Sequence, residues 1–358
     1  MASTNNLALA RHSITLENLQ IDFLTHNQSF YNWLSSYYHT EGSNGGNDTD
    51  TASKTCTNYS ITLEALGSPH ELVLPARREG LFTKFCLIAD AHCYFQDGKF
   101  TSQAEGVLAH QLEIDVHART VRGNIGGVFL ESEESFIYIV VRDILRRLVL
   151  PLSGLIMLHG SVVTCGHQTI FFAGDKAMGK STIALEMLKL GYKIISDDSP
   201  IAALTAGGAH VLSGLDQLSV TENTLRLFPE LEDCVSRQRD VSGKYFLDRN
   251  KLSATRVTAE ARRITDFVQL NRGAHEQPSL QSIDKSMATA NLIREFMPLF
   301  RKEIAIEQDA NFFRDKNQTM FQILSGLLSG ASSHELKYSD AHRSAVPALL
   351  SSLSTKQN

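Results

Sequence analysis

The chain has 358 residues, with 34 Lys and Arg against 39 Asp and Glu, and a formal net charge of −5. Its hydrophobic content of 42% excludes wholesale disorder, and its length predicts two domains or one domain with a large extension. The mild acidity argues against a dedicated duplex-binding protein, which needs a basic face, so we expect no nucleic-acid partner.

The cysteines and the apolar segments indicate the compartment. Five cysteines are dispersed without a CxxC pair, which is typical of reduced thiols in a cytosolic protein rather than of disulfides or a zinc site. The most apolar stretch, 148–158, is too short to span a membrane, and residues 1–20 lack the long apolar region of a signal peptide. We therefore expect a cytoplasmic protein with no membrane association.

Residues 1–132 predict a mostly antiparallel, β-rich module. The segments 59–66 and 106–116 alternate apolar and polar residues, as half-buried strands do. Asp97-Gly98 lies between aromatic residues in 93–100 and predicts a hairpin. The module contains no chemical motif, and its role, structural or substrate-recruiting, stays open.

A second domain is expected at 133–345, followed by a flexible tail at 346–358. Apolar residues recur at helical spacing through 133–150 and predict an amphipathic helix that ends near Pro151. Gly191 is a natural residue to follow the C-terminus of a later helix. We expect strands at 161–165, 169–174, 193–196, 200–204, 210–212, 267–270 and 334–338, and helices at 181–190, 287–304 and 312–328.

Residues 174–181, GDKAMGKS, match the Walker A pattern GxxxxGK[ST], and we call them the glycine loop. A β-rich run precedes the loop and a helical segment follows it, which is the setting that the motif requires. Gly174 and Gly179 permit a tight path that turns backbone N–H groups towards an anion, and the helix N-terminus adds its positive end. Lys180 can then address the β- and γ-phosphates of a nucleotide, and the Ser181 hydroxyl can bind Mg²⁺. The alternative without a binding function is a glycine turn with an exposed lysine.

We expect the whole loop and the first turn of the helix to contact the nucleotide. These residues are Gly174, Asp175, Lys176, Ala177, Met178, Gly179, Lys180, Ser181 and Thr182.

Asp197 and Asp198 directly follow the strand expected at 193–196. If that strand neighbours the one that precedes the glycine loop, the two carboxylates lie beside the loop. One carboxylate could bind Mg²⁺, and the other could accept the proton of a hydroxyl that receives a phosphoryl group. The alternative is an acidic turn at a strand end. His159, ahead of the strand at 161–165, is on its own typical of a satisfied core histidine.

Together these residues resemble the kinase core of HPr kinase/phosphorylase and the HPr-kinase-related P-loop serine kinases. The resemblance covers 158–198, where an HG dipeptide, a strand pair, a GDxGxGKS-type loop, a helix, a glycine, a hydrophobic strand and Asp-Asp follow in order. Weaker similarity continues at 213–230, 244–248, 264–270 and 335–340. The resemblance implies an α/β fold, with a P-loop HPr-kinase-like C-terminal core and an N-terminal, mostly β (α+β) module. Relatives in this family are commonly oligomeric, which implies a homo-oligomer.

The resemblance implies an ATP- and Mg²⁺-dependent kinase that transfers the γ-phosphate to a hydroxyl. The acceptor would be a serine of a peptide or protein, or a small hydroxylated metabolite. One of Asp197 and Asp198 would be the general base and the other would address the metal. We favour Asp198 as base, with Asp197 and Ser181 as metal ligands, and we place His159 in the active site near the carboxylates.

Three departures from the family pattern qualify this interpretation. Ala177 stands where the loop usually has a third glycine, which is tolerable if its φ is negative. No run resembling LEIRGLGI follows the acidic pair, which argues against phosphorylase activity and against HPr as the substrate. Residues 1–130 do not resemble the usual N-terminal domain of HPr kinase.

Two further interpretations remain open. The chain could be a nucleotide-binding regulator or assembly factor with little transfer activity, although a pure binder has no need of a spare base. A decarboxylating enzyme resembling phosphoenolpyruvate carboxykinase would need metal-ligand motifs that we do not find. Among the basic residues of the second half, Lys244 is the first candidate for stabilising charge in the transition state.

Overall fold

The computed structural model describes residues 9–17, 19–37, 57–65, 92–96, 99–104, 110–125, 142–214, 218–238, 243–248, 251–252, 261–296 and 310–353. The chain divides into two compact units, Met1–Ser153 with Arg301–Asn311, and Gly154–Phe300 with Phe312–Asn358. It is a mixed α/β structure, as predicted.

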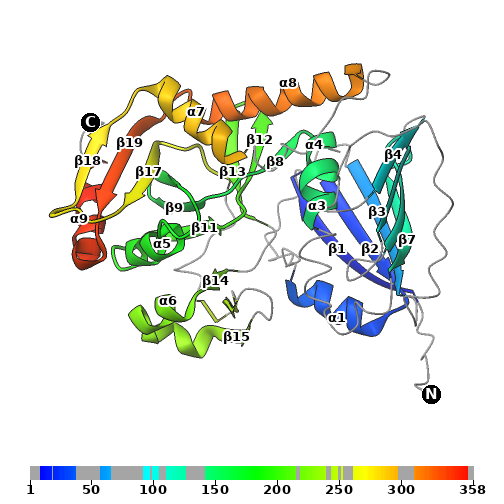
Figure 1. Cartoon of the computed structure of the whole chain (residues 1–358), viewed down its shortest axis with the longest axis horizontal. Helices are drawn as coiled ribbons and strands as arrows, with labels where there is room; N and C mark the ends of the chain where they lie inside the picture. Colours follow the sequence, from blue (N-terminus) through cyan, green and yellow to red (C-terminus); the bar gives the residue numbers. More distant parts are fainter. Residues whose placement is uncertain are drawn as a thin grey trace, which may run out of the picture. The chain divides into compact units, whose positions relative to one another are not determined.

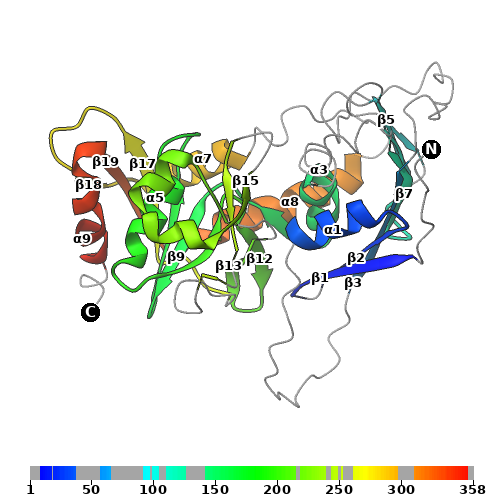
Figure 2. The ribbon, with the colours of Figure 1, turned by 90° about the horizontal axis from the view of Figure 1, so that it is seen from below.

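The first unit is built on a seven-stranded, mostly antiparallel sheet in the order β1-β2-β3-β7-β6-β5-β4 (Figure 2). The two parallel pairs of this sheet both involve β3, which lies between β2 and β7. The hairpin predicted at Asp97-Gly98 is confirmed, because Gln96 of β4 pairs with Lys99 of β5 and leaves two residues between the strands. The strands are β1 (Ala10–Leu16), β2 (Leu19–Thr25), β3 (Thr57–Ala65), β4 (His92–Gln96), β5 (Lys99–Ala104), β6 (His110–Asp115) and β7 (Thr120–Ile125).

Helix α1 (Gln28–Tyr37) packs on β1 and β2 and was not predicted. Its start is set by Asn27, whose side-chain oxygen accepts a hydrogen bond from the Phe30 N–H at 2.8 Å. Such a cap satisfies one of the N–H groups that the first turn of a helix leaves without a partner.

The predicted helix at 133–150 is described only from Arg142. It consists of α3 (Arg142–Ile144), a π-helical turn (Leu145–Val149) and α4 (Leu150–Leu152), with its apolar side chains buried. The helix groups with the first unit, so the division lies at Ser153/Gly154 rather than at the expected 132/133.

The second unit is built on a six-stranded sheet in the order β11-β9-β10-β17-β19-β18. The neighbouring strands β10, β17 and β19 are parallel. All of β10 and the first five residues of β17 are buried, which is typical of strands covered on both faces. Helix α5 (Lys180–Leu188) packs on one face, and α7 (Lys285–Phe296) and α8 (Ala310–Leu327) pack on the other (Figure 1). The strands are β9 (Ser161–Cys165), β10 (Gln168–Ala173), β11 (Lys193–Asp197), β17 (Asp266–Arg272), β18 (Ser279–Ser282) and β19 (Ser332–Tyr338).

Two small sheets accompany the main sheet. One is ordered β13-β12-β8 and the other β14-β16-β15, with α6 (Glu222–Leu227) and a 3-10 helix (Pro229–Cys234) beside the second. The strands are β8 (Leu155–Met157), β12 (Ile201–Thr205), β13 (Gly208–Leu212), β14 (Ser219–Val220), β15 (Val235–Gln238) and β16 (Tyr245–Leu247).

The chain passes twice between the β8–β12 sheet and the main sheet. The first passage, 158–160, joins β8 to β9, and the second, 198–200, joins β11 to β12. The two passages run side by side, because the Leu158 N–H donates a hydrogen bond to Pro200 O at 2.8 Å. His159 lies in the first passage and Asp198 in the second, so the bend places these side chains together.

The expected flexible tail, 346–358, instead begins with a packed helix, α9 (Val346–Ser351). Val346, Leu350 and Leu353 recur at helical spacing and are buried in the same core as α5. The spacing of these apolar residues explains why a helix forms at 346–351. Residues 354–358 lie outside the described part of the chain.

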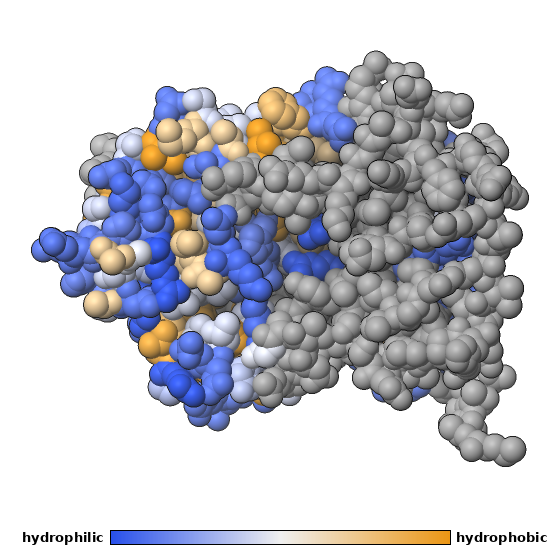
Figure 3. Space-filling model, in the orientation of Figure 1, coloured by the Kyte–Doolittle hydropathy of each residue, from blue (hydrophilic) through white to orange (hydrophobic). Residues whose placement is uncertain are grey.

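The exposed large apolar side chains of the described second unit come from separate elements. On the face seen in Figure 3, hydrophilic residues cover most of the coloured surface and apolar ones form small separate groups. The exposed side chains in this unit are Leu190, Leu204, Leu227, Met287 and Phe321. The homo-oligomer stays a prediction. Among the described residues, the structure contains no helix with the length and apolar character needed to cross a membrane.

Candidate functional site

The glycine loop connects the end of β10 to the start of α5, as predicted. Gly179 is the N-cap of α5 and has φ +86°, and Ala177 has φ +69°. Left-handed residues at 177 and 179, with one residue between them, give the alternating backbone pattern of an anion-binding nest. The condition under which alanine is readily tolerated at position 177, a negative φ, is therefore not met, and the loop adopts there the left-handed conformation that glycine adopts more readily.

Replacing Ala177 by Gly is expected to raise the free energy of unfolding by about 0.5–1 kcal/mol. The substitution relieves the left-handed strain of a side-chain-bearing residue, and this gain exceeds the added entropy of the unfolded chain. Urea unfolding of the purified protein measures the change. Ala184→Gly is the control, because Ala184 is buried inside α5 and glycine there should lower the stability. Equal losses in both variants would contradict the strain at Ala177.

Lys180 is held inside the loop. Its Nζ donates hydrogen bonds to Gly174 O at 2.6 Å and to Asp175 O at 3.1 Å, and the residue is only 8% exposed. Ser181 and Thr182, in the first turn of α5, are half-buried. The lysine ammonium and the N-terminus of α5 therefore place positive charge at the same point.

The acidic pair lies at the same sheet edge as the loop, but not on a neighbouring strand. Strand β9 separates β11 from β10, and Ser161 at its start is paired with both Phe172 and Asp197. Since β9 is antiparallel to both neighbours, β10 and β11 run in the same direction and end at the same edge. The two strands are therefore not neighbours, and Ser161 of β9 lies between Asp197 and the end of β10.

Asp197 is a buried carboxylate with two serine neighbours. The Ser161 hydroxyl donates a hydrogen bond to Asp197 Oδ1. Burial raises the pKa of Asp197 above its ordinary value of 3.8, and the charge of Asp198 raises it further. Ser161, Lys244 and the Ser181 hydroxyl act in the opposite direction. Asp197 and Ser181, the two predicted metal ligands, are therefore close together.

Asp197→Asn is expected to stabilise the fold at pH 7. The raised pKa means that the folded state binds the Asp197 proton more tightly than the unfolded chain, so the wild type loses stability as pH rises above about 4. Asparagine removes this loss and can still accept the Ser161 hydrogen bond. Chemical denaturation between pH 4 and 8 should show a difference between variant and wild type that shrinks towards pH 4. A difference that does not change with pH would contradict the prediction.

Asp198 is contacted by two basic side chains. His159 Nδ1 lies 3.1 Å from Asp198 Oδ1 and 3.3 Å from the Asp198 carbonyl oxygen. Both of these oxygens are acceptors, which assigns the ring proton to Nδ1. On the other side, Lys244 Nζ lies 3.8 Å from Asp198 Oδ2. Asp198 itself has φ +69°, a conformation that Asp and Asn tolerate better than most residues.

The structure brings together the residues that the sequence assigns to the catalytic group. Lys180, Asp197, Asp198 and His159 come to one sheet edge, and Lys244, the first basic candidate, joins them from the start of β16. The role of each stays a prediction, since position alone does not test it.

Three contacting residues were missed: Ser161, Arg272 as a loop contact, and Tyr338. Arg272 Nη1 donates to Ala177 O at 3.0 Å, and Tyr338 Oη donates to Met178 O at 2.6 Å. Ser161 could have been found from its place directly after the HG dipeptide. For Arg272 and Tyr338 the sequence carries no local signal, because both reach the loop from distant strands.

The donor set suits Mg²⁺ better than a metal held by protein alone. Among the described residues, no group of three or more His, Cys, Asp and Glu side chains could enclose a metal ion. Two adjacent carboxylates and the Ser181 hydroxyl are hard oxygen donors, and the charge of Asp198 raises the Asp197 pKa, a repulsion that a divalent cation would relieve. Mg²⁺ is commonly bound by one or two carboxylates together with substrate phosphates, so these residues fit it.

Comparison with known proteins does not identify a family for this chain. No protein-family model matches the chain, and no curated protein matches it. Among solved structures, the HPr(Ser) kinase/phosphatase from Coxiella burnetii matches with 11% identity over 56% of this chain and 94% of its own, with a TM-score of 0.29. A TM-score this low carries no argument about function.

Proposed function

We propose that this protein is an ATP- and Mg²⁺-dependent phosphotransferase that acts on a hydroxyl group. A serine of a peptide or protein is the first acceptor to test, and a small hydroxylated metabolite is the second. The observation that carries the proposal is the position of Asp198, held between His159 and Lys244 at the sheet edge where the glycine loop begins.

The glycine loop binds the donor in this proposal. Its left-handed residues turn backbone N–H groups towards the phosphates, and Lys180 leaves its contacts with Gly174 O and Asp175 O for the β- and γ-phosphate oxygens. The exchange has a small net cost, because each lost contact is replaced by a charge-assisted one.

In this proposal Asp197 and Ser181 would hold Mg²⁺. The bound ion would neutralise negative charge on the phosphates. The Ser161 hydrogen bond orients the Asp197 carboxylate and leaves its other oxygen for the metal. Ser161 is therefore a positioning residue for Asp197.

Asp198 accepts the proton of the acceptor hydroxyl. As that oxygen forms its bond to the γ-phosphorus, the bond from the γ-phosphorus to the β-γ bridging oxygen breaks, and ADP leaves with that oxygen. The proton moves from the hydroxyl to Asp198, so the step balances. His159, with its proton on Nδ1, holds the carboxylate, and the Lys244 ammonium stabilises the negative charge that spreads over the transferring group.

The test is transfer of labelled phosphate. The purified chain is incubated with Mg²⁺ and ATP labelled in the γ-phosphate, with a soluble extract of its source cells as the acceptor pool. Mass spectrometry then identifies which molecules gain one phosphoryl group. We expect Mg²⁺-dependent labelling of a hydroxyl, lost when EDTA is added. Tight ATP binding by calorimetry without labelled product in any fraction would overturn transfer and favour a nucleotide-dependent regulator.

A further inference from the structure

Two successive carbonyl groups of the glycine loop are held from outside the loop. Tyr338 Oη, at the end of β19, donates to Met178 O at 2.6 Å, and Arg272 Nη1, at the end of β17, donates to Ala177 O at 3.0 Å. Neither donor residue is part of the glycine motif. Both donors lie on β17 and β19, which are on the side of β10 opposite to β9.

The two donors form one unit. Arg272 and Tyr338 are paired in register on neighbouring strands, and beyond them the Gly273 N–H donates to Tyr338 O at 3.0 Å. Arg272 also forms an ion pair with Asp340, which raises the pKa of the guanidinium further above its ordinary value. The backbone pairing thus fixes the two residues relative to each other, and Asp340 also holds the Arg272 side chain.

Tyr338 is buried against the loop backbone. It is 1% exposed, and burial raises the pKa of its hydroxyl to about 12, so the group remains a hydrogen-bond donor at neutral pH. A Cβ atom at Gly179 would lie 2.2 Å from Tyr338 Oη. The hydroxyl therefore sits where any side chain at position 179 would have to be.

The geometry of the peptide unit gives these contacts a consequence for anion binding. In a trans peptide the C=O and the following N–H point in opposite directions, so fixing Met178 O towards Tyr338 points the Gly179 N–H away from it. Fixing Ala177 O likewise orients the Met178 N–H, which donates to Asp175 O at 3.2 Å and closes the turn of the loop.

We propose that Tyr338 and Arg272 form a latch, a pair of positioning residues that holds the glycine loop in its anion-binding conformation. The proposal deepens the proposed function and rests on it for the identity of the anion, a nucleoside triphosphate. The latch offsets the unfavourable left-handed conformation of Ala177 and fixes the Gly179 N–H before the ligand arrives.

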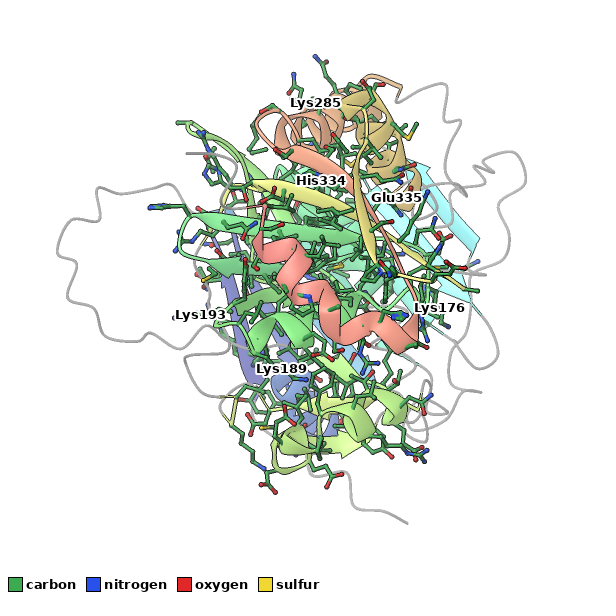
Figure 4. The ribbon with its side chains drawn as sticks, turned by 90° about the vertical axis from the view of Figure 1, so that its left-hand side faces the viewer. Lys176, Lys189, Lys193, Lys285, His334 and Glu335 are labelled. Atoms are coloured by element: carbon green, nitrogen blue, oxygen red, sulfur yellow. The ribbon has the colours of Figure 1, made fainter. Side chains whose placement is uncertain are left out.

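The test removes one hydroxyl at a time. Tyr338→Phe deletes the donor to Met178 and keeps the ring. Tyr192→Phe is the matched control, because Tyr192 is another buried tyrosine whose hydroxyl, with a pKa also raised to about 12 by burial, donates to Gln168. That contact lies at the opposite end of the strands. In Figure 4, Lys193, next to Tyr192, and Lys176, in the loop, lie at opposite ends of the sheet.

Two readouts are needed. Hydrogen exchange of the peptide 174–182 without nucleotide reports the latch itself, and the dissociation constants of ATP and of inorganic tripolyphosphate report its consequence. We expect Tyr338→Phe to speed exchange in this peptide and to weaken both ligands about 5- to 20-fold, with kcat at saturating ATP within about twofold of wild type. Tyr192→Phe should leave loop exchange and affinity unchanged.

The outcomes separate the latch from the proposed function. Loop exchange and affinity equal in the two tyrosine variants would overturn the latch. Faster loop exchange in Tyr338→Phe alone, in a protein that binds neither ATP nor tripolyphosphate, would support the latch and overturn the proposed function. If Tyr338→Phe does not fold, Arg272→Gln gives the same decision, because this side chain is 39% exposed and its removal leaves the core intact.

Discussion

Asp198→Asn is expected to lower the rate of phosphoryl transfer by about 100- to 10,000-fold, the range for loss of a general base. Asparagine has the shape of aspartate but does not accept the proton of the acceptor hydroxyl. It also tolerates the left-handed backbone that Asp198 adopts, whereas alanine would add strain and confound the result. ATP affinity should therefore remain within about threefold of wild type, as Asp198 is not assigned to the donor phosphates.

Single-turnover transfer and calorimetric ATP binding, measured on the same preparation, check this prediction. Asp233→Asn is the matched control, because Asp233 is an exposed carboxylate on the 3-10 helix, outside the site. Transfer by Asp198→Asn at the wild-type rate would remove Asp198 from the mechanism. A loss of transfer together with a loss of ATP affinity would point to damage of the fold instead.

Lys180→Ala is expected to weaken ATP binding by about 10- to 100-fold, which corresponds to the loss of a hydrogen bond to a charged group. AMP, which has no β- or γ-phosphate, should lose much less affinity. This contrast distinguishes a lysine that addresses the terminal phosphates from one that only supports the loop through Gly174 O and Asp175 O. Lys180→Arg should not restore binding, because the larger planar guanidinium does not fit a site built around a point charge.

Competition titrations with ATP, ADP and AMP provide the measurement. Lys189→Ala is the control, since Lys189 lies at the other end of α5, is exposed and pairs with Glu186 at 2.8 Å. Equal weakening of ATP and AMP by Lys180→Ala would contradict the assignment and would indicate collapse of the loop.

The local parts of the site could be predicted from the sequence. The apolar run of β10, the glycine motif and the start of α5 are consecutive, so their order along the chain already determines the strand–loop–helix arrangement. Gly191, expected after the helix, has φ +84°, as a residue in that position requires. The acidic pair could be placed near the loop from its position after a strand, whereas His159 was placed in the site only through the resemblance.

The long-range parts could not be predicted. The position of β9 between β10 and β11 depends on strand pairing, which a period of two residues does not encode. The donors to Ala177 O and Met178 O, Arg272 and Tyr338, lie far along the chain. The short strands β14, β15 and β16 have two to four residues each, too few to show the alternation of apolar and polar residues that predicts a strand. The position of Lys244, directly before β16, could therefore not be predicted either.

The two sides of β10 also differ in when they can form. A short turn at 166–167 joins β9 to β10, but Arg272 is 95 residues from Ala177, and Tyr338 is 160 residues from Met178. During synthesis the motif leaves the ribosome well before β17 and β19 exist, and contacts of such sequence separation form late in folding. An unfinished chain would contain the sequence GDKAMGKS but would lack the hydrogen bonds from Arg272 and Tyr338 to the loop. A nucleotide that binds the finished loop would therefore stabilise only the completed core and would report on whether folding has reached its end.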